Sequence, residues 1–355
     1  MTATDLSSSA SETTPVEIWF TRCGGATAST VAIQKNWLHA EFDGAGTSLC
    51  SLLDNQNPDI RESHFDHSIK SLFREGGNIP PIWARAKGTD TVTLGITWVD
   101  EYQTIVTRAD SDISSIADLK GKRLAVPLYR NVSIDFFRGS AFHGFANALG
   151  LAGLGREDVS FVDVVIESQR GMRGGGRPSG SAELDALKAG TVDAVFLRQG
   201  SGLKLAKEHA SEIRLLIDLS EHADPFRRVN NGTPRPITVH RDFLEQHRDL
   251  VVRYLTVLLR SAAWAEANPE EAIQTIADED GRVGAAIIAE AYPKLATSLT
   301  PKLTPDYIAG LEAQKNFLRD WGFLEADFEI NDWIVSGPLE EAERLVARDV
   351  QIAAE

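Results

Sequence analysis

The sequence predicts an α/β protein with two lobes. The chain leaves the first lobe, forms the second, and then returns to the first. Two successive sets of short apolar strands alternate with helical segments, which is typical of sheets covered by helices. Residues 218–235 then lack helical periodicity, and a largely helical remainder indicates a return to the first lobe. The 355 residues are enough for two cores. We therefore expect a disordered lead at 1–15, lobe 1 at 16–104 and 225–355, and lobe 2 at 105–224.

Lobe 1 is expected to begin with a strand at 16–21, which is rich in β-branched and aromatic residues. The elements expected after it are a helix at about 26–38, a strand at 46–53, a short helix at about 66–73, a helix that starts after Asn78 and a strand at 91–98. Cys50 lies in an apolar-rich run without a neighbouring base or cation, so we expect it to belong to the core.

Lobe 2 is expected to repeat the alternation. Residues 102–107 are expected to continue extended and to leave lobe 1. The elements expected after them are a short helix, a glycine stop and a strand within 114–127, a helix at 132–149, a strand at 161–166, a helix at 182–189 and a strand at 193–197. Residues 169–181 are too rich in glycine for regular structure, and both a mobile loop over a cleft and an unstructured excursion fit them. This segment lacks the Lys-Ser/Thr ending of a P-loop, so it predicts no nucleotide site.

The last third of the chain is expected to be helical after a re-entry strand at 236–240. Apolar residues repeat there at helical spacing, which favours a packing stripe over a cofactor site: Leu244, Val251, Tyr254, Leu255, Leu258 and Leu259. Helix starts are expected at 268–271, 303–306 and 326–329, and a helix stop at 321–322.

Composition excludes several classes of protein. A formal net charge of −15 disfavours binding to nucleic acid and to anionic membrane surfaces. The two cysteines have no metal-ligand spacing and provide no disulfide framework, and no metal or organic cofactor is implied. The first residues lack the basic and apolar regions of a secretion signal, and no apolar run is long enough to span a bilayer. We therefore expect a cytoplasmic protein, with a monomer favoured.

The stretch 64–83 predicts an anion site. Gly76 and Gly77 allow backbone conformations that turn successive N–H groups toward one point. Asn78 is placed to cap a helix whose first turn carries two prolines, and the amides at such a helix start favour an oxyanion. Arg74 adds a fixed charge with a two-pronged donor. The alternative interpretation is a loop between two surface helices.

Cys23 is the candidate thiol. It follows the first strand directly, next to Arg22 and before a helix, and this setting lowers a thiol pKa and exposes the sulfur. A small buried hydrophobe at a strand end is the alternative. His64 and His67 are candidate partners for the thiol. Arg198, directly after a lobe 2 strand, is a further candidate that reaches into the cleft, or else a surface charge.

Two sequence segments resemble those of the type II periplasmic-binding-protein architecture, in its nitrate, sulfonate and taurine-binding branch. They are Asp118-Leu-Lys-Gly-Lys-Arg-Leu-Ala-Val126 and Ala189-Gly-Thr-Val-Asp-Ala194. The resemblance covers most of the chain. It implies an α/β fold with two lobes and a ligand cleft between them.

A narrower resemblance lies in the first third of the chain. Cys23, His64-Phe65 and the run Arg74-x-Gly-Gly-x-Ile-Pro-Pro81, in which Arg74 follows His64 at a spacing of ten, are similar to the 2′-hydroxybiphenyl-2-sulfinate desulfinase family. The resemblance implies a catalytic cysteine at Cys23, an assisting histidine at His64, and a sulfinate held by Arg74 and the Gly76-Gly77 backbone. His67 is the rival of His64. Arg22 before the cysteine and Gly24-Gly25 after it depart from the Asn and Pro of the family.

The sequence thus predicts a hydrolase acting on carbon–sulfur bonds, a desulfinase that releases sulfite from an aromatic sulfinate. Aromatic candidates for the organic group are Trp19, Trp98, Phe136, Phe137 and Phe142. The alternative is a non-catalytic binder of sulfonate, taurine-like or related anions. The pyrimidine-synthesising branch of the same scaffold is a third possibility, which the lack of a cysteine-rich motif disfavours.

Overall fold

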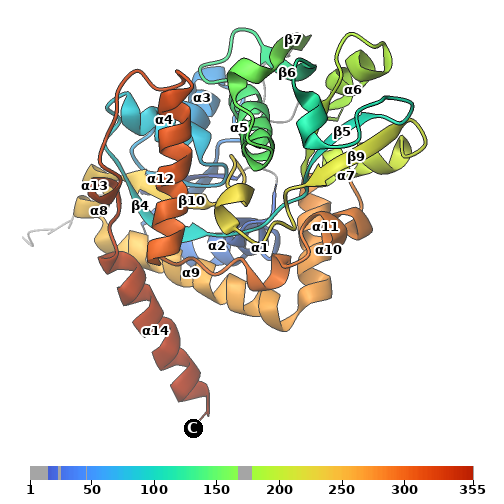
Figure 1. Ribbon diagram of the computed structural model, residues 1–355. Coiled ribbons are helices and arrows are strands. Elements are labelled where there is room, and N and C mark those ends of the chain that lie inside the picture. Colours follow the sequence, from blue (N-terminus) through green and yellow to red (C-terminus); the bar gives the residue numbers. More distant parts are fainter. Residues whose placement is uncertain (1–14, 23–24, 45, 167–177, 355) are drawn as a thin grey trace, which may run out of the picture.

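The computed structural model describes residues 15–22, 25–44, 46–166 and 178–354 (Figure 1). The lead predicted at 1–15 lies outside the described residues except for its last residue. Cys23 and the glycine-rich segment up to residue 177 also lie outside them. None of the helices in the described part of the chain combines the length and the apolar character needed to cross a membrane.

Lobe 1, as the term is used here, is built on a five-stranded sheet with the strand order β2-β1-β3-β10-β4. Its strands are β1 (Val16–Arg22), β2 (Thr47–Ser51), β3 (Leu72–Glu75), β4 (Thr91–Thr97) and β10 (Arg235–His240). β1 runs parallel to β2 and β3, whereas β10 is antiparallel to β3 and β4. The strands expected at 16–21, 46–53, 91–98 and 236–240 are confirmed. All four residues of β3 are buried, because strands cover both of its edges.

Two helix predictions in lobe 1 are wrong. The single helix expected at 26–38 is two helices, α1 (Ala28–Gln34) and α2 (Trp37–Phe42), because Asn36 adopts a left-handed conformation with φ 60°. No helix is observed over most of 66–73, where one was expected; the helix in this region ends at Asp66. The observed helix is α3 (Pro58–Asp66), and β3 follows it. Asn57 caps α3 and Pro58 occupies its first turn, a start signal that the sequence carried.

Lobe 2 consists of two smaller sheets, joined by an isolated bridge between Leu124 and Ala194. One sheet has the antiparallel order β8-β5-β9, with β5 (Gln103–Arg108), β8 (Val195–Arg198) and β9 (Ile213–Asp218). The other pairs β6 (Arg123–Tyr129) with β7 (Ser160–Ile166) in parallel. The helices are α5 (Phe136–Leu151), α6 (Ser181–Lys188) and α7 (Gln199–Glu208), with short 3₁₀ turns at Ile116–Leu119 and Arg156–Asp158. The alternation predicted for this part of the chain is confirmed.

The chain returns to lobe 1 through a 3₁₀ turn at Pro225–Arg228 and then becomes helical. The helices are α8 (Arg241–Gln246), α9 (Arg248–Ala267), α10 (Pro269–Asp280), α11 (Ala285–Ala291), α12 (Pro305–Asp320), α13 (Ile330–Trp333) and α14 (Gly337–Ala354), with a 3₁₀ turn at Leu295–Thr297. The starts expected at 268–271 and 303–306 and the stop at 321–322 are confirmed. The helix expected to start within 326–329 begins just beyond, at Ile330. Figure 1 shows α14 projecting from the body of the molecule.

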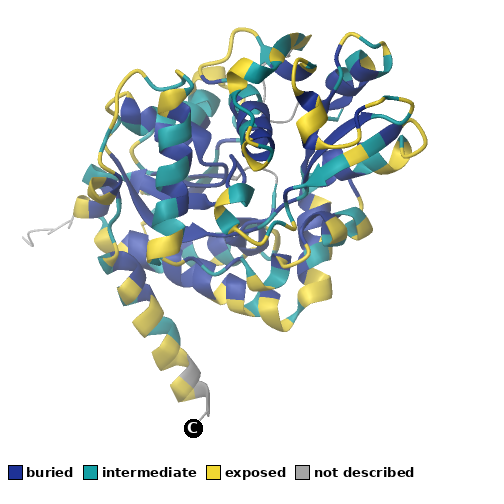
Figure 2. Cartoon of the chain, viewed as in Figure 1, coloured by how far each residue is buried: buried dark blue, intermediate teal, exposed yellow. Residues whose placement is uncertain are grey.

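The predicted apolar stripe of the last third packs as expected. Val251, Tyr254, Leu255 and Leu258 of α9 are fully buried against lobe 1, and Figure 2 shows buried residues along the face of α9 that meets the sheet. Phe73 of β3 stacks on Tyr254 with a centroid distance of 4.0 Å. α9 therefore supports the strand that carries Arg74.

Helix α12 packs across both lobes. It contacts α4 (Ile79–Ala86) and β4 in lobe 1, while its Phe317 joins the apolar cluster of lobe 2. His143 of α5 lies buried against this helix, stacked on Phe317 at 3.9 Å and hydrogen-bonded through Nδ1 to Gln314 Oε1 at 3.0 Å. The lobe boundaries expected at 104/105 and 224/225 stay a prediction.

The buried imidazole of His143 predicts acid sensitivity. Burial lowers its pKa to about 4, although the hydrogen bond to Gln314 opposes the shift. Between about pH 6.5 and 4 the unfolded chain binds a proton at this residue that the native state does not, so stability falls as pH falls. His143 alone contributes a slope of about 1.4 kcal/mol per pH unit in that window.

We expect His143→Gln to lose this slope in urea unfolding measured from pH 7 to 4. His222→Gln, at a partly exposed position, is the matched control and keeps the slope of the parent. An unchanged pH dependence in His143→Gln would show that the imidazole is not kept neutral by burial.

Candidate functional site

The first contact of the candidate site joins the end of β1 to the last turn of α3. Thr21 Oγ1 and His64 Nδ1 lie 2.9 Å apart, and both residues are buried. α3 places His64 there because it starts at Pro58 and ends at Asp66, where the next residue, His67, takes a left-handed conformation with φ 56°. Thr21 precedes Cys23 by two residues, so a histidine is held beside the strand end that leads into the predicted thiol.

The imidazole of His64 is kept neutral by its surroundings. Burial, followed by the charges of Arg74 and His67, holds the pKa of His64 well below its usual value. A neutral imidazole can both accept and donate a hydrogen bond at neutral pH. The residue is therefore suited to orient an adjacent group through a hydrogen bond, whereas the lowered pKa makes it a weak base at neutral pH.

Arg74 lies on the central strand β3 and is fully buried. It pairs with Thr21 of β1 on one side and with Thr238 of β10 on the other. Its Nε donates to the His64 carbonyl oxygen at 2.9 Å, and its Nη1 donates to the Gly77 carbonyl oxygen at 2.8 Å. One guanidinium thus ties the end of α3 to the Gly-Gly turn. The predicted role of Arg74 in holding a sulfinate stays a prediction.

The Gly-Gly turn needs its glycines for two different reasons. Gly76 has φ 154°, a backbone conformation that side chains rarely allow. A Cβ on Gly77 would lie 2.7 Å from the side-chain amide of Asn231, so the backbone passes too close to that residue for any side chain. Asn231 lies in the segment between β9 and β10, here called the second crossing between the lobes; the first crossing is the segment between β4 and β5. The turn is therefore shaped by a contact with a distant segment.

The start of α4 differs from the predicted open anion site. Helix α4 begins after Asn78 as expected, but the Asn78 side chain donates to the carbonyl oxygens of Asn230 and Pro234 instead of capping the helix. The amides of Asn78 and Ile79 donate to the carbonyl and side-chain oxygens of Asn231, at 2.8 and 2.9 Å. These two amides are thus already used by the protein. Ligand contacts at Gly76 and Gly77 stay a prediction.

His67, the rival of His64, belongs to a different contact. It is fully buried, with Nε2 2.8 Å from Thr238 Oγ1, and its carbonyl oxygen accepts from His240 Nε2. Burial, Arg74 and His240 hold its pKa well below the usual value. Among the contacts described for it, none joins it to β1. The structure thus brings His64, not His67, to the strand end before Cys23.

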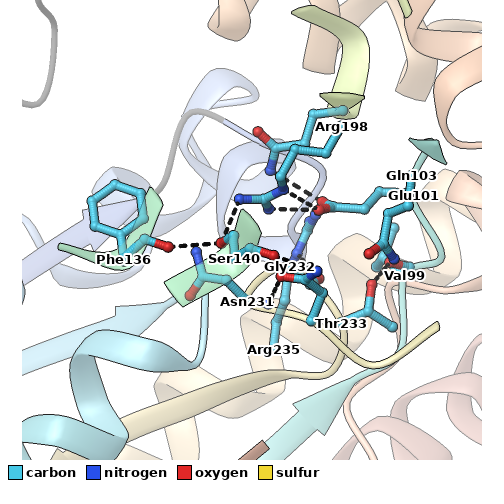
Figure 3. Close-up of polar contacts among 12 residues, drawn as sticks. Val99, Glu101, Gln103, Phe136, Ser140, Arg198, Asn231, Gly232, Thr233 and Arg235 are labelled. Atoms are coloured by element: carbon cyan, nitrogen blue, oxygen red, sulfur yellow. Dashed lines mark hydrogen bonds and ion pairs between the residues drawn. The ribbon is translucent and has the colours of Figure 1, made fainter. Parts of the chain in front are cut away.

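Arg198 is not a surface charge. It is buried, and it donates from Nε and Nη2 to Glu101 Oε1 at 2.9 and 2.5 Å and from Nη1 to Ser140 Oγ at 3.1 Å (Figure 3). The surface charge that was the alternative interpretation is therefore wrong. Its partner in the described residues is a carboxylate of the protein, so a ligand role at Arg198 stays a prediction.

A row of aromatic rings leads from the site into lobe 2. His64 packs edge-to-face on Phe65 at 4.8 Å, and Phe65 stacks on Phe136 at 6.2 Å. Phe137 follows Phe136 at 4.3 Å, and Tyr129 stacks on Phe137 at 4.8 Å. Phe136 and Phe137 are thus placed beside the site.

The remaining aromatic candidates lie in other contacts. Trp98 packs on Tyr307 at 5.4 Å, and the Trp19 indole donates to Glu17. Phe142 packs in the lobe 2 core. Cys50, expected in the core, is only half-buried, because its strand β2 lies at the edge of the sheet.

Four residues that shape the site were missed. Glu75 follows Arg74 on β3, is fully buried, and accepts from the amides of Ser29 and Ala28 at 2.8 and 3.3 Å. Burial raises its pKa, against these hydrogen bonds and the charge of Arg235. The others are Glu101, Asn231 and Arg235. A charged residue inside an apolar strand was a signal for Glu75, whereas nothing local marked Glu101.

Comparison with known proteins found a family model and several relatives that are similar to this chain. The family model described as NMT1/THI5 like matches residues 80–167. The 2′-hydroxybiphenyl-2-sulfinate desulfinases of Rhodococcus erythropolis and Rhodococcus qingshengii are each 25% identical over 326 residues, covering 82% of this chain and 85% of theirs.

Solved structures share the fold. The desulfurization enzyme DSZB superposes with a TM-score of 0.73 at 22% identity, covering 93% of this chain and 99% of its own. The periplasmic aliphatic sulphonate binding protein SsuA from Escherichia coli gives 0.64 at 18%, covering 91% and 92%. The chain is thus a distant relative of the sulfinate desulfinases, on the two-lobed α/β fold that these enzymes share with periplasmic sulfonate-binding proteins.

Proposed function

We propose that the protein is a desulfinase that cleaves the carbon–sulfur bond of an aromatic sulfinate resembling 2′-hydroxybiphenyl-2-sulfinate. The observation that carries the proposal is the bonded unit of Thr21, His64 and Arg74, which leads directly into Cys23. The relatives that are similar over 82% of the chain carry the name of this activity. A serine mutant of DSZB that replaces a cysteine has been solved with biphenyl-2-sulfinic acid, which supports a sulfinate as the ligand class.

The proposed reaction consumes one water molecule. The sulfinate ArSO₂⁻ and water give ArH and HSO₃⁻: the carbon–sulfur electron pair stays with the ring carbon, which takes a proton, and sulfur takes the water oxygen. Cys23 serves either as the nucleophile toward sulfur or as the acid that protonates the ring carbon. Both roles need a hydrogen-bonded partner for the thiol. With Nδ1 of His64 bonded to Thr21, Nε2 is the atom we assign to that partner.

The sulfinate oxygens are assigned to Arg74 and the backbone of Gly76 and Gly77. The guanidinium is held in orientation by the carbonyl oxygens of His64 and Gly77, so it needs little reorganisation to bind a sulfinate. Full burial of Arg74 strengthens its attraction for an anion. The flat organic group is assigned to the aromatic row of Phe65, Phe136, Phe137 and Tyr129.

A working thiol has to stay reduced, which favours the cytoplasm as its compartment. The proposed partner is the small-molecule sulfinate alone, bound by a monomer.

The test is to incubate the purified protein with a panel of aryl sulfinates, alkyl sulfinates and alkyl sulfonates, and to assay sulfite. We expect sulfite from aryl sulfinates only. Binding of an alkyl sulfonate with no turnover of any sulfinate would replace the proposal with an anion-binding function, the role named for SsuA.

A further inference from the structure

A buried ion cluster lies where the two crossings meet lobe 2. Glu101, between β4 and β5, is fully buried, and Oε1 accepts from Arg198. Its Oε2 accepts from Gln199 Nε2 at 3.0 Å and from Arg235 Nη2 at 3.2 Å. Figure 3 shows the three charged residues converging from separate segments. A buried carboxylate persists only when it is paired in this way.

Ionisation of Glu101 is secured by its two partners. Burial opposes the charge, but Arg198 and Arg235 outweigh that effect and lower the pKa of Glu101. The second crossing approaches so closely that a Cβ on Gly232 would overlap the Glu101 carboxylate. The cluster is therefore a tightly fitted junction and not a loose surface pair.

Arg235 also extends away from this cluster. Its Nε donates to the Gly232 carbonyl oxygen at 2.7 Å, and its Nη1 donates to the carbonyl oxygen of Ala26. Ala26 is fully buried, between β1 and α1, three residues after Cys23 in the sequence. The Arg235 guanidinium thus joins the Glu101 carboxylate to the backbone of Ala26, in the segment between Cys23 and α1.

The same segment has two further attachments. Thr30 Oγ1 donates to the Gly25 carbonyl oxygen at 3.0 Å, and Glu75 accepts from the first amides of α1. Arg235 is the attachment that reaches the lobe junction. Its donors lie in a fixed planar fork, so a lysine, with a single flexible ammonium, cannot reproduce the contacts to Glu101, Gly232 and Ala26 together.

We propose that Arg235 is a positioning residue, which sets the path of residues 25–26 and thereby the placement of the preceding thiol, with Glu101 holding the guanidinium in orientation. Through Arg198 and Ser140 this restraint extends to lobe 2. The kinetic part of the inference rests on the proposed function, whereas the structural part does not.

The test uses a Cys50→Ser background, in which Cys23 is the remaining thiol. Arg235→Lys is compared with Arg228→Gln, a matched control at the same junction. Arg228 Nε donates to Asp100 Oδ1 at 2.8 Å, and its Nη1 donates to the His222 carbonyl oxygen. The readouts are the rate of iodoacetamide alkylation from pH 6 to 9, the melting temperature, and kcat and KM for an aryl sulfinate.

In Arg235→Lys we expect alkylation to become about fivefold faster at every pH, because the segment opens more often. We expect kcat to fall about 10- to 100-fold with KM little changed, since a shift of about 1 Å in a reacting group suffices for such a loss. Arg228→Gln should lower the melting temperature without changing either rate.

Alkylation of Arg235→Lys at the parent rate would overturn the inference. If the parent itself releases no sulfite, the proposed function fails, and the alkylation comparison still decides the role of Arg235. If Arg235→Lys does not fold, Glu101→Gln decides instead. It has nearly the same size and removes the anionic partner of Arg235, so faster alkylation supports the inference and the parent rate overturns it.

Discussion

Replacing Cys23 by serine is expected to abolish sulfite release while an aryl sulfinate still binds. A hydroxyl is a far weaker nucleophile and acid than a thiol at neutral pH. Removal of a catalytic nucleophile costs about a thousandfold in kcat or more. Sulfite release would be measured at saturating sulfinate, and binding by isothermal titration calorimetry with the same compound.

The matched control is Cys50→Ser. Cys50 is half-buried on the edge strand β2, where burial raises its pKa, so it has no thiolate character to lose. Turnover by this variant should equal that of the parent. Full activity in Cys23→Ser would end the thiol assignment, whatever the second cysteine does.

Replacing Arg74 by lysine is expected to weaken sulfinate binding about thirtyfold or more, since disrupting one partner of a buried hydrogen-bonded charge pair costs about 2 kcal/mol or more of binding free energy. The guanidinium of Arg74 donates to the carbonyl oxygens of His64 and Gly77, and a lysine ammonium cannot replace both contacts. The positive charge is retained, so any loss reports the geometry of the donors. Equilibrium binding of an aryl sulfinate to the Cys23→Ser protein measures this without turnover.

Arg85→Lys is the control for Arg74→Lys. Arg85 lies on α4 and pairs with Asp90 at 2.5 Å, at the protein surface. Its replacement should leave the dissociation constant of the sulfinate unchanged. Unaltered affinity in a folded Arg74→Lys protein would place the anion elsewhere, with Arg198 of lobe 2 as the next residue to test.

Much of the fold could be predicted because its signals are local. Prolines after Asn268 and Thr304 mark helix starts, and the apolar stripe of α9 repeats every three or four residues. The missed strand β3 shows the limit of such signals. Leu72 and Phe73 are buried on both faces of a central strand, and a short continuous apolar run does not distinguish a strand from a buried helix.

The candidate site divides in the same way. His64 was singled out by the resemblance to the desulfinase family, and Arg74 by that resemblance and by the paired glycines that follow it. The structure joins the two residues by a hydrogen bond. Asn231 accepts a hydrogen bond from the Ile79 amide at the start of α4, although the two residues are 152 positions apart in the sequence. Arg235 and Glu101, which form an ion pair, are 134 positions apart. No local pattern encodes such pairs, because burial decides which polar groups must find each other.

The sequence by itself determined the alternation of strands and helices, the return of the chain to lobe 1, and the residues that resemble a sulfinate site. Tertiary structure alone decided which histidine meets the end of β1, that the amides at the start of α4 are occupied, and that Arg198 and Arg235 share Glu101. The physical reason is that charged and polar side chains, once buried, are placed by partners that only the folded chain brings within reach.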